Sequence, residues 1–442
     1  MQAGVLHSLL VVILLGTPLA NAGAETITWD GEIDSNWFNP ANWDPDAYPA
    51  DDANRIVSLG TPTASADVRA DSGGVITVTS GALATFGANL YVADASTGTL
   101  NIMAGGAVTG TNGYIGHSAG SNGTGMVDGG GSTWTTYGDL YVAREGSGTL
   151  TITGGAAVRN TYGHIGYSAD SNGTVTVDGA GSTWTNSQYL HVGRAGSGRL
   201  TVAGGASLSN QGASIGYEPG STGDVTVRDP CSMWTTYGDL SVGREGVGSL
   251  SIAAGGYAHN GWSACVGRDP GSTGTVAVEG EGSTWSSAGG LYVGGSDTAA
   301  GGTGGVSVCD GALLEVGEAL KVWPDGTLDV AGGKVRIGGG AEPNAGQVRI
   351  GPDGTLDLRG GQVTCGSFDN TAGGTLDFTG GTLTVDGGAF DPGDPNVTLN
   401  GPGNPTLTLT GGATVAIGRE VRVGWTDGNE GTLNILDGAR IS

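Results

Sequence analysis

Residues 140–189 read LYVAREGSGTLTITGGAAVRNTYGHIGYSADSNGTVTVDGAGSTWTNSQY, and Leu190-His191-Val192 then begins the same pattern again. The Leu-x-Val triplet that opens this stretch starts at residues 90, 140, 190, 240 and 291. A half-length echo lies inside the period, because Gly148-Thr149-Leu150-Thr151-Ile152 is followed 25 residues later by Gly173-Thr174-Val175-Thr176-Val177. The elementary repeat is therefore about 25 residues long, a length found in repeat architectures.

Each repeat contains three brief segments in which apolar and small polar residues alternate, as in Leu190-x-Val192, Leu200-x-Val202 and Ala206-x-Leu208. Alternation over two or three residues is typical of half-buried strands rather than helices. One repeat cannot bury its own apolar row, but stacking the repeats in register buries leucine on leucine and pairs every backbone group. We therefore predict an all-β fold: a right-handed, three-sided parallel β-helix, or solenoid, of roughly 15 coils, its handedness taken from the general preference of crossover connections.

The segments of the chain differ in regularity, and Leu9–Leu15 followed by Ala20-Asn21-Ala22 is typical of a secretory signal peptide with its cleavage site. No later apolar run approaches the roughly 18 residues needed to cross a bilayer, so we expect no transmembrane segment in the mature chain. We predict the following organisation: a signal peptide (1–22), a Trp-rich capping segment containing Trp29, Trp37 and Trp43 (23–64), a regular β-helix of 50-residue double coils (65–310), less regular coils (311–384), a Pro- and Gly-rich protruding loop (385–405) and resumed coils that stop inside a unit (406–442).

Composition restricts the chemistry of the chain, which has 42 acidic residues against 17 lysines and arginines and a net charge of −25. Nucleic-acid binding is excluded because it needs a basic surface, and we interpret the acidic residues as keeping an exposed rod soluble. The position after each Val-x-Val does not form a calcium-binding carboxylate ladder, since Arg228 interrupts Asp128, Asp178 and Glu279. Four widely spaced cysteines without a CxxC pair, and the absence of a nucleophile motif, predict no metal site, no cofactor and no catalytic residues.

The repeat also resembles a known family. Leu190-x-Val192-Gly193, Gly198-x-Leu200-Thr201-Val202 and the run Gly173–Trp184 are similar to the type V secretion and PEP-CTERM-associated repeat of bacterial surface proteins, densely over roughly residues 86–300. The segment around Trp29, Trp37 and Trp43 is similar to one that opens exported repeat proteins of this kind. The resemblance implies secretion and an autotransporter-passenger-like β-helical rod, and it brings no catalytic residues.

One column of outward-facing side chains follows from aligning the coils through Leu140-Tyr141-Val142 and His164-Ile165-Gly166. It contains the candidate binding residues Tyr91, Tyr114, Tyr141, His164, His191 and Tyr292, with Ser214, Ser241 and Cys265 between the last two. We favour a ladder that stabilises the sheet through cross-strand pairs of about 0.2–1 kcal/mol each; the alternative is an aromatic strip that stacks sugar rings. A metal pair of His164 and His191 lacks a third strong ligand. A second column, Trp134, Trp184, Trp234 and Trp285, is expected to pack in the core.

Taken together, these features predict a non-enzymatic bacterial protein, secreted or displayed on the cell surface, that serves as a stalk or adhesin-like passenger. Its expected partners are cell-surface or matrix polysaccharide or other surface proteins, and no nucleic acid. The alternative is an extracellular β-helix that binds or degrades polysaccharide. Sites must be argued from their own chemistry rather than from the fold, so the ligand stays open.

Overall fold

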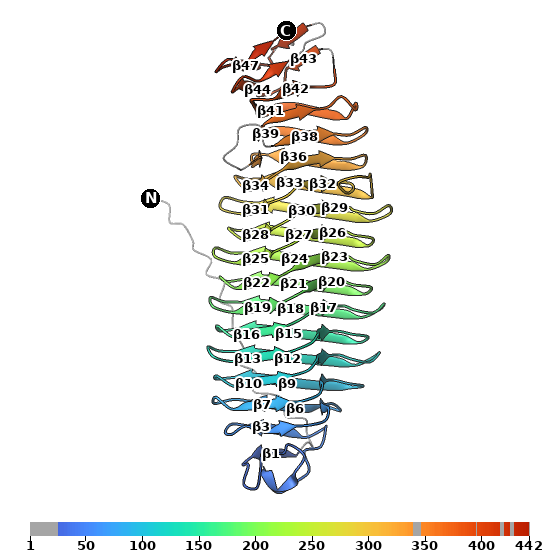
Figure 1. Cartoon of the computed structure of the whole chain (residues 1–442), viewed down its shortest axis with the longest axis vertical. Coiled ribbons are helices and arrows are strands. Elements are labelled where there is room, and N and C mark those ends of the chain that lie inside the picture. Colours follow the sequence, from blue (N-terminus) through green and yellow to red (C-terminus); the bar gives the residue numbers. More distant parts are fainter. Residues whose placement is uncertain (1–24, 339–345, 395, 416–419, 425–427, 442) are drawn as a thin grey trace, which may run out of the picture.

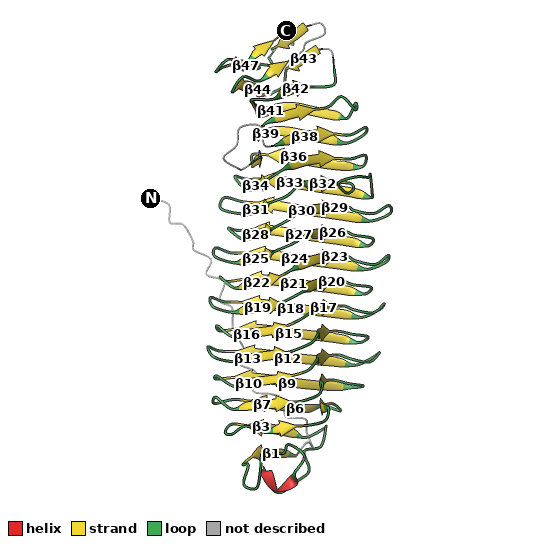
Figure 2. Cartoon of the chain, in the orientation of Figure 1, coloured by secondary structure: helices red, strands yellow, loops and turns green. Residues whose placement is uncertain are grey.

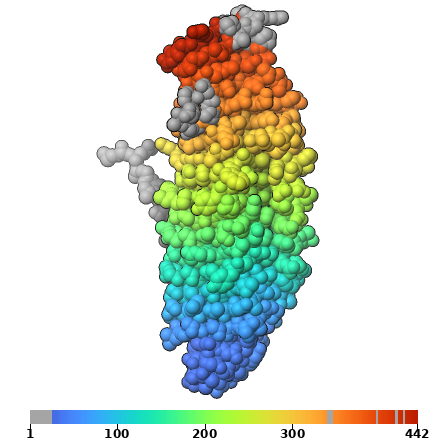
Figure 3. All heavy atoms as spheres, in the orientation of Figure 1, coloured from blue at the N-terminus to red at the C-terminus, as the bar shows by residue number. Residues whose placement is uncertain are grey.

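The computed structural model describes residues 25–338, 346–394, 396–415, 420–424 and 428–441, which form one elongated rod (Figures 1 and 3). The signal peptide expected at 1–22 lies outside the described residues. Coils follow one another along the rod in sequence order, and nearly all the regular structure is strand (Figure 2). The rod is a parallel β-solenoid of about 16 turns with about 25 residues per turn, as predicted. In the described part of the chain, no helix is long and apolar enough to span a membrane.

Each regular coil contributes three strands, one to each face of the rod. Strands of the first face are β1 (Thr26–Trp29), β3 (Asn54–Val57), β6 (Gly74–Val78), β9 (Thr97–Met103), β12 (Asn122–Asp128), β15 (Ser147–Thr153), β18 (Asn172–Asp178), β21 (Ser197–Ala203), β24 (Thr222–Arg228), β27 (Val247–Ala253), β30 (Thr273–Glu279), β33 (Thr303–Cys309) and β36 (Gly326–Ala331).

Strands of the second face pair with the equivalent strands of neighbouring coils and belong to the same 30-stranded sheet as the first face. They are β4 (Thr63–Ala64), β7 (Leu83–Phe86), β10 (Ala107–Gly110), β13 (Thr133–Thr136), β16 (Ala157–Asn160), β19 (Thr183–Asn186), β22 (Ser207–Asn210), β25 (Met233–Thr236), β28 (Tyr257–Asn260), β31 (Thr284–Ser287), β34 (Leu313–Val316), β37 (Lys334–Ile337), β44 (Gly403–Thr410) and β47 (Thr432–Ile435). Two long strands, β39 (Thr355–Cys365) and β41 (Thr375–Asp386), run over both faces.

The third face is a separate 16-stranded sheet. Its strands are β5 (Val68–Ala70), β8 (Leu90–Val92), β11 (Gly113–Ile115), β14 (Leu140–Val142), β17 (Gly163–Ile165), β20 (Tyr189–Val192), β23 (Gly212–Ile215), β26 (Leu240–Val242), β29 (Ala264–Val266), β32 (Leu291–Val293), β35 (Ala319–Val322), β38 (Gln347–Ile350), β40 (Ser367–Asp369), β42 (Ala389–Asp391), β45 (Thr414–Val415) and β48 (Arg440–Ile441). The remaining elements lie near the two ends: η1 (Pro40–Asn42), β2 (Trp43–Asp44), β43 (Asn396–Leu399) and β46 (Glu420–Val423).

In-register pairing produces the apolar core. Leu150 lies opposite Val175, and Val175 lies opposite Leu200, on consecutive coils, and all three side chains are fully buried. Because most inward positions are stacked on another apolar residue, one continuous apolar cluster runs through the rod. At about 25 cal/mol per Å² of buried apolar surface, this core is the main stabilising contribution.

Three tryptophan rings cover the apolar core at the N-terminal end of the rod. Trp37 packs edge-on against Trp43 with centroids 4.8 Å apart and against Phe86 of β7 at 5.2 Å. Trp29 packs against Trp43 at 5.3 Å, and all three tryptophans are buried. The aromatic edge-to-face geometry gives the end of the rod a packed cover in place of open strands.

The Pro- and Gly-rich stretch 385–405 is not a protruding loop, since the described residues there form β42 and β43 and begin β44. Stacking overrides the local turn signals: Phe390 on β42 packs over Phe368 on β40 at 5.3 Å, and Leu399 is buried. An apolar residue placed one coil above another is held by that contact even where the intervening residues favour turns.

The second tryptophan column packs in the core, as expected. Trp134, Trp184, Trp234 and Trp285 are all buried, and three of them donate their indole N–H to an asparagine one coil earlier: Trp184 to Asn160 (2.7 Å), Trp234 to Asn210 (2.7 Å) and Trp285 to Asn260 (3.1 Å). Trp134 Nε1 is buried without a partner among the described residues. The position that corresponds to the asparagines is Gly110, which has no side chain to accept the bond.

This difference predicts opposite effects for two substitutions. Asn210→Ala leaves the Trp234 N–H and the Thr236 hydroxyl without their partner and is expected to lower the free energy of unfolding by about 1–3 kcal/mol. Gly110→Asn is expected to raise it, because a Cβ there meets nothing closer than 3.6 Å and the new amide reaches Trp134 and Thr136. Urea unfolding of both variants checks the pair; destabilisation by Gly110→Asn contradicts the explanation.

Candidate functional site

The predicted outward column lies on the third face, with one residue from each strand. Register pairs Tyr91 with Tyr114, Tyr114 with Tyr141, Tyr141 with His164, and His164 with His191. Consecutive rings lie 4.8, 5.1, 4.7 and 5.4 Å apart, with interplanar angles of 19° or less. The rings therefore stack face to face along the rod axis, so each ring covers the faces of its neighbours.

A second row of side chains, from the loops that follow these strands, covers the column from outside. His117 packs edge-on against Tyr91 and Tyr114, both at 4.9 Å. Tyr167 packs in the same way against Tyr141 at 5.1 Å and against His164 at 5.0 Å, and Tyr217 against His191 at 4.8 Å. As a result only 7% of the His164 surface is exposed. This packing favours the stabilising ladder, because the ring faces that a sugar would need are occupied.

Two arginines stack on the tyrosine rings of this second row. The guanidinium of Arg194 lies 4.4 Å from the Tyr167 ring, and that of Arg244 lies 4.5 Å from the Tyr217 ring. Arg194 also pairs with Glu218 on the next coil at 3.0 Å. Cation–π contacts of this kind contribute about 0.5–2 kcal/mol each, so the two arginines help to fix the tyrosine rings over the column.

The two stacked histidines, His164 and His191, are neutral at pH 7 because their pKa values are lowered. Burial lowers the pKa of His164 to about 3, and repulsion of a protonated ring by Arg194 and by a protonated His191 acts in the same direction. Burial and the charges of Arg194 and Arg244 lower the pKa of His191 to about 4. Within the described ranges, no three His, Cys, Asp or Glu residues are grouped so that they could hold a metal ion.

Tyr292 belongs to the same column but is separated from the other rings. Ser214, Ser241 and Cys265 occupy the three intervening coils, and register pairs Cys265 with Tyr292. Beside these small side chains lies a hollow of about 330 Å³, with Asp239, Arg268 and Asp297 among its lining residues. Burial raises the pKa of the Cys265 thiol to about 11, so the thiol stays protonated and weakly nucleophilic.

A row of exposed rings that the sequence interpretation missed lies at the corner before the third face. We call it the corner row; its members are 38–74% exposed and come from five coils: Tyr137, Tyr162, Tyr189, Tyr237 and Trp262. Backbone hydrogen bonds such as Thr161 N–H to Gly138 O (2.8 Å) and Gln188 N–H to Thr161 O (2.9 Å) hold the corner segments one above another. These rings do not follow the period of the sequence, because they precede the aligned third-face triplets by one, two or three residues. The signal that could have revealed them is the presence of large aromatic residues among Gly, Ser and Asn.

Comparison with known proteins found no matching family model and no match among curated proteins. A solved structure is similar: the crystal structure of a hyper-glycosylated fragment of TibA whose glycosylation was catalysed by TibC. The two chains superpose with a TM-score of 0.43 and 19% sequence identity, over 81% of this chain and 97% of the fragment. The family resemblance of the repeat stays a prediction.

Proposed function

We propose that this chain is a non-enzymatic β-helical rod, exported to the cell surface or extracellular matrix, that serves as a stalk or adhesin-like passenger. The observation that carries the proposal is continuity: the described residues between Thr26 and Ile441 stack around one apolar cluster. Such a stack makes an elongated, laterally stiff body whose outer surface repeats from coil to coil, which suits a spacer or an extended binding surface. The net charge of −25 supports exposure to solvent along the whole length.

Export is tested by expressing the tagged chain in a bacterial host with and without residues 1–22. We expect the complete chain to be reached by protease added to intact cells or found in the medium, and the shortened chain to be protected inside. Equal retention of both chains in the cytoplasm overturns the export part of the proposal.

The corner row favours polysaccharide binding as a second candidate function. Exposed tyrosine and tryptophan rings offer apolar faces beside hydrogen-bonding groups, which suits them to stack on sugar rings. Replacing Tyr137, Tyr237 and Trp262 together by serine is therefore expected to weaken retention on a bound polysaccharide at least tenfold. Affinity electrophoresis over a panel of neutral and acidic polysaccharides measures the change.

The matched control is Tyr48→Ser, which removes an exposed ring near the N-terminal end, away from the corner row. It is expected to leave retention unchanged. If the triple variant is retained as strongly as the parent chain on every polysaccharide that binds the parent, the corner row does not bind sugar.

A further inference from the structure

The continuous sheet on the first face of the rod stops at β41, partway through a coil. Thr375–Phe378, the first part of β41, pairs with β39 on the preceding coil. On the following side, β44 pairs with β41 only from Gly380 onward. The strand that arrives above Thr375–Phe378 is β43, which pairs with β46 in a separate two-stranded sheet. Among the described residues, this part of β41 therefore has a sheet partner on one side only.

The backbone groups on the unpaired side can be assigned. Successive residues of a strand direct their N–H and C=O groups to opposite neighbours. Thr375 N–H donates to Gly354 O on the preceding coil at 2.8 Å. The N–H and C=O groups of Leu376 and Phe378 therefore point toward the gap between β41 and β43, where the sheet would otherwise continue.

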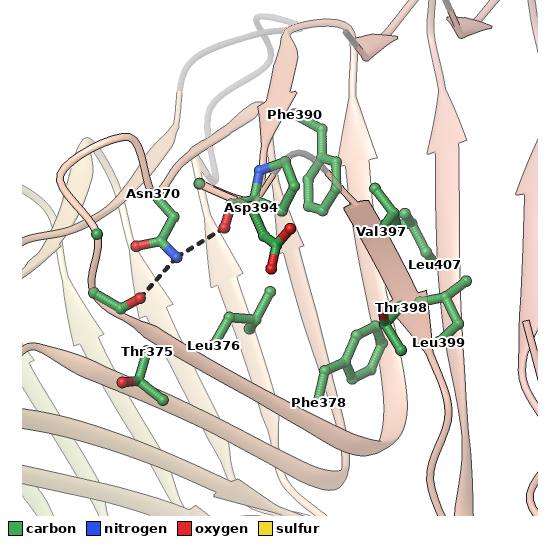
Figure 4. A pocket seen from close by; sticks show the side chains of 14 residues that line it. Asn370, Thr375, Leu376, Phe378, Phe390, Asp394, Val397, Thr398, Leu399 and Leu407 are labelled. Atoms are coloured by element: carbon green, nitrogen blue, oxygen red, sulfur yellow. Dashed lines mark hydrogen bonds between the residues drawn. The ribbon is translucent and has the colours of Figure 1, made fainter. Parts of the chain in front are cut away.

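Apolar side chains line the same gap. A hollow of about 520 Å³ lies there, bordered by Leu376 and Phe378 of β41, Phe390 of β42, Val397 of β43 and Leu407 of β44 (Figure 4). One coil earlier, Leu356 and Leu358 occupy the positions of Leu376 and Phe378 and are fully buried, whereas Leu376 and Phe378 are only partly covered. The hollow is thus a section of the rod's core in which the next strand, β43, stands apart from β41 instead of pairing with it.

The rim of the hollow is held by Asn370. Its side-chain amide donates to Gly374 O at 3.0 Å and to Pro392 O at 2.9 Å, which ties the loop before β41 to the loop after β42 (Figure 4). Asn370 is itself buried. The rim of the hollow at Asn370 is therefore held by hydrogen bonds between the two loops.

We propose that this gap binds an extended peptide segment, which adds a strand to the open edge of β41 and places alternate apolar side chains in the hollow. A peptide strand is favoured over a small apolar molecule because the edge presents backbone donors and acceptors at the spacing of a strand. A peptide can form hydrogen bonds with these groups and fill the hollow with its side chains at the same time. The open edge, Thr375–Phe378, is four residues long, about 13 Å. The outward neighbour Asp377 favours a neutral or basic residue between the apolar ones. The proposal does not depend on the function of the rod as a whole.

Hydrogen exchange tests the open edge without any ligand. We expect the amides of Leu376 and Phe378 to exchange at least a hundredfold faster than those of Leu356 and Leu358, which lie between two paired coils. Similar protection at the four amides overturns the proposal, because the edge would then be paired.

The probe for binding is the fluorescein-labelled peptide GTLKLRG, which copies residues 354–360, the strand that β41 pairs with one coil earlier, with Asp357→Lys because this position lies opposite Asp377. We expect saturable binding to the full chain and at least tenfold slower exchange at Leu376 and Phe378 in the complex. A second peptide carries backbone N-methyl groups on its lysine and arginine, so it keeps both leucines but loses two N–H groups directed at β41. It is expected to bind at least tenfold more weakly; equal binding shows that the hollow takes apolar groups without strand pairing and overturns the proposal, as does no saturable binding of the first peptide.

Variants of the chain locate the site. Leu376→Glu places a charge in the wall of the hollow and is expected to weaken GTLKLRG binding at least tenfold. Leu433→Glu, at another partly buried leucine near the same end but outside the hollow, is the control and is expected to keep the parent affinity. Equal loss in both variants overturns the assignment to this gap. If circular dichroism shows that Leu376→Glu unfolds the end coils, the N-methyl comparison on the parent chain still decides the question.

Discussion

Replacing Gly148 by alanine is expected to lower the stability of the rod by about 3 kcal/mol or more, one of the largest effects of a single methyl group in this chain. A Cβ at Gly148 would lie 2.5 Å from Ile115 O on the preceding coil and 2.6 Å from Ala143 N. Both are backbone atoms held by strand pairing, so neither can move without shifting a coil. The same position is glycine on successive coils, and register pairs Gly148 with Gly123 and Gly173.

Gly130→Ala is the matched control. Nothing lies within 4 Å of a Cβ at Gly130, and its φ is not in the left-handed region. Alanine there is expected to leave stability unchanged or raise it by about 0.4–1 kcal/mol, since it restricts the unfolded chain. Thermal unfolding followed by circular dichroism compares the two variants. Equal midpoints for Gly148→Ala and the parent would show that coils can separate to admit a methyl group.

Acid is expected to destabilise the rod below about pH 6.5 through the stacked histidines. In the folded chain burial lowers the pKa of His164 to about 3 and that of His191 to about 4, whereas in the unfolded chain both titrate near their ordinary value of 6.5. Above pH 6.5 both states are neutral and the contribution is fully present. As the pH falls, only the unfolded state takes up protons, so stability is lost progressively down to pH 3–4. Shifts of this size correspond to a few kcal/mol.

The measurement is the difference in unfolding midpoint between pH 7.5 and pH 5.0. The double variant His164→Gln, His191→Gln is expected to lose some stability at pH 7.5, because two stacked rings are removed, but to show a clearly smaller difference between the two pH values. Tyr114→Gln removes a ring from the same column without removing a histidine, so its midpoint should fall by a similar amount at both pH values. An unchanged pH difference in the double variant would falsify the assignment of acid sensitivity to this pair.

The register of the stack could be predicted because the period is nearly constant from Leu90 to Leu291, which leaves one alignment that buries every leucine. The column from Tyr91 to His191 followed from the same alignment. The second row of side chains, formed by His117, Tyr167 and Tyr217, could not be predicted from this alignment, since these residues belong to loops whose path depends on three-dimensional packing.

Two further features could not be predicted from the periodicity of the sequence. The indoles of Trp184, Trp234 and Trp285 each donate to an asparagine 24 or 25 residues earlier in the chain. This pairing became apparent only when the register placed those asparagines beside the rings. The open edge of β41 depends on β43 leaving the stack to pair with β46, a change of partner made between sequence segments that resemble ordinary coils. Local pattern determines which residues form strands, but competition between neighbouring strands determines which edges remain open.

The direction of the hydrogen bonds between coils also determines how the rod responds to tension. These bonds run along the long axis, so a load applied to the two ends pulls on the bonds of one coil at a time instead of shearing many in parallel. A coil of about 25 residues that peels away adds roughly 80 Å of extended chain to a tether. Stretched from its two ends, the rod would lengthen in even steps at nearly constant force and absorb mechanical energy, then shorten again as coils wind back onto the intact stack.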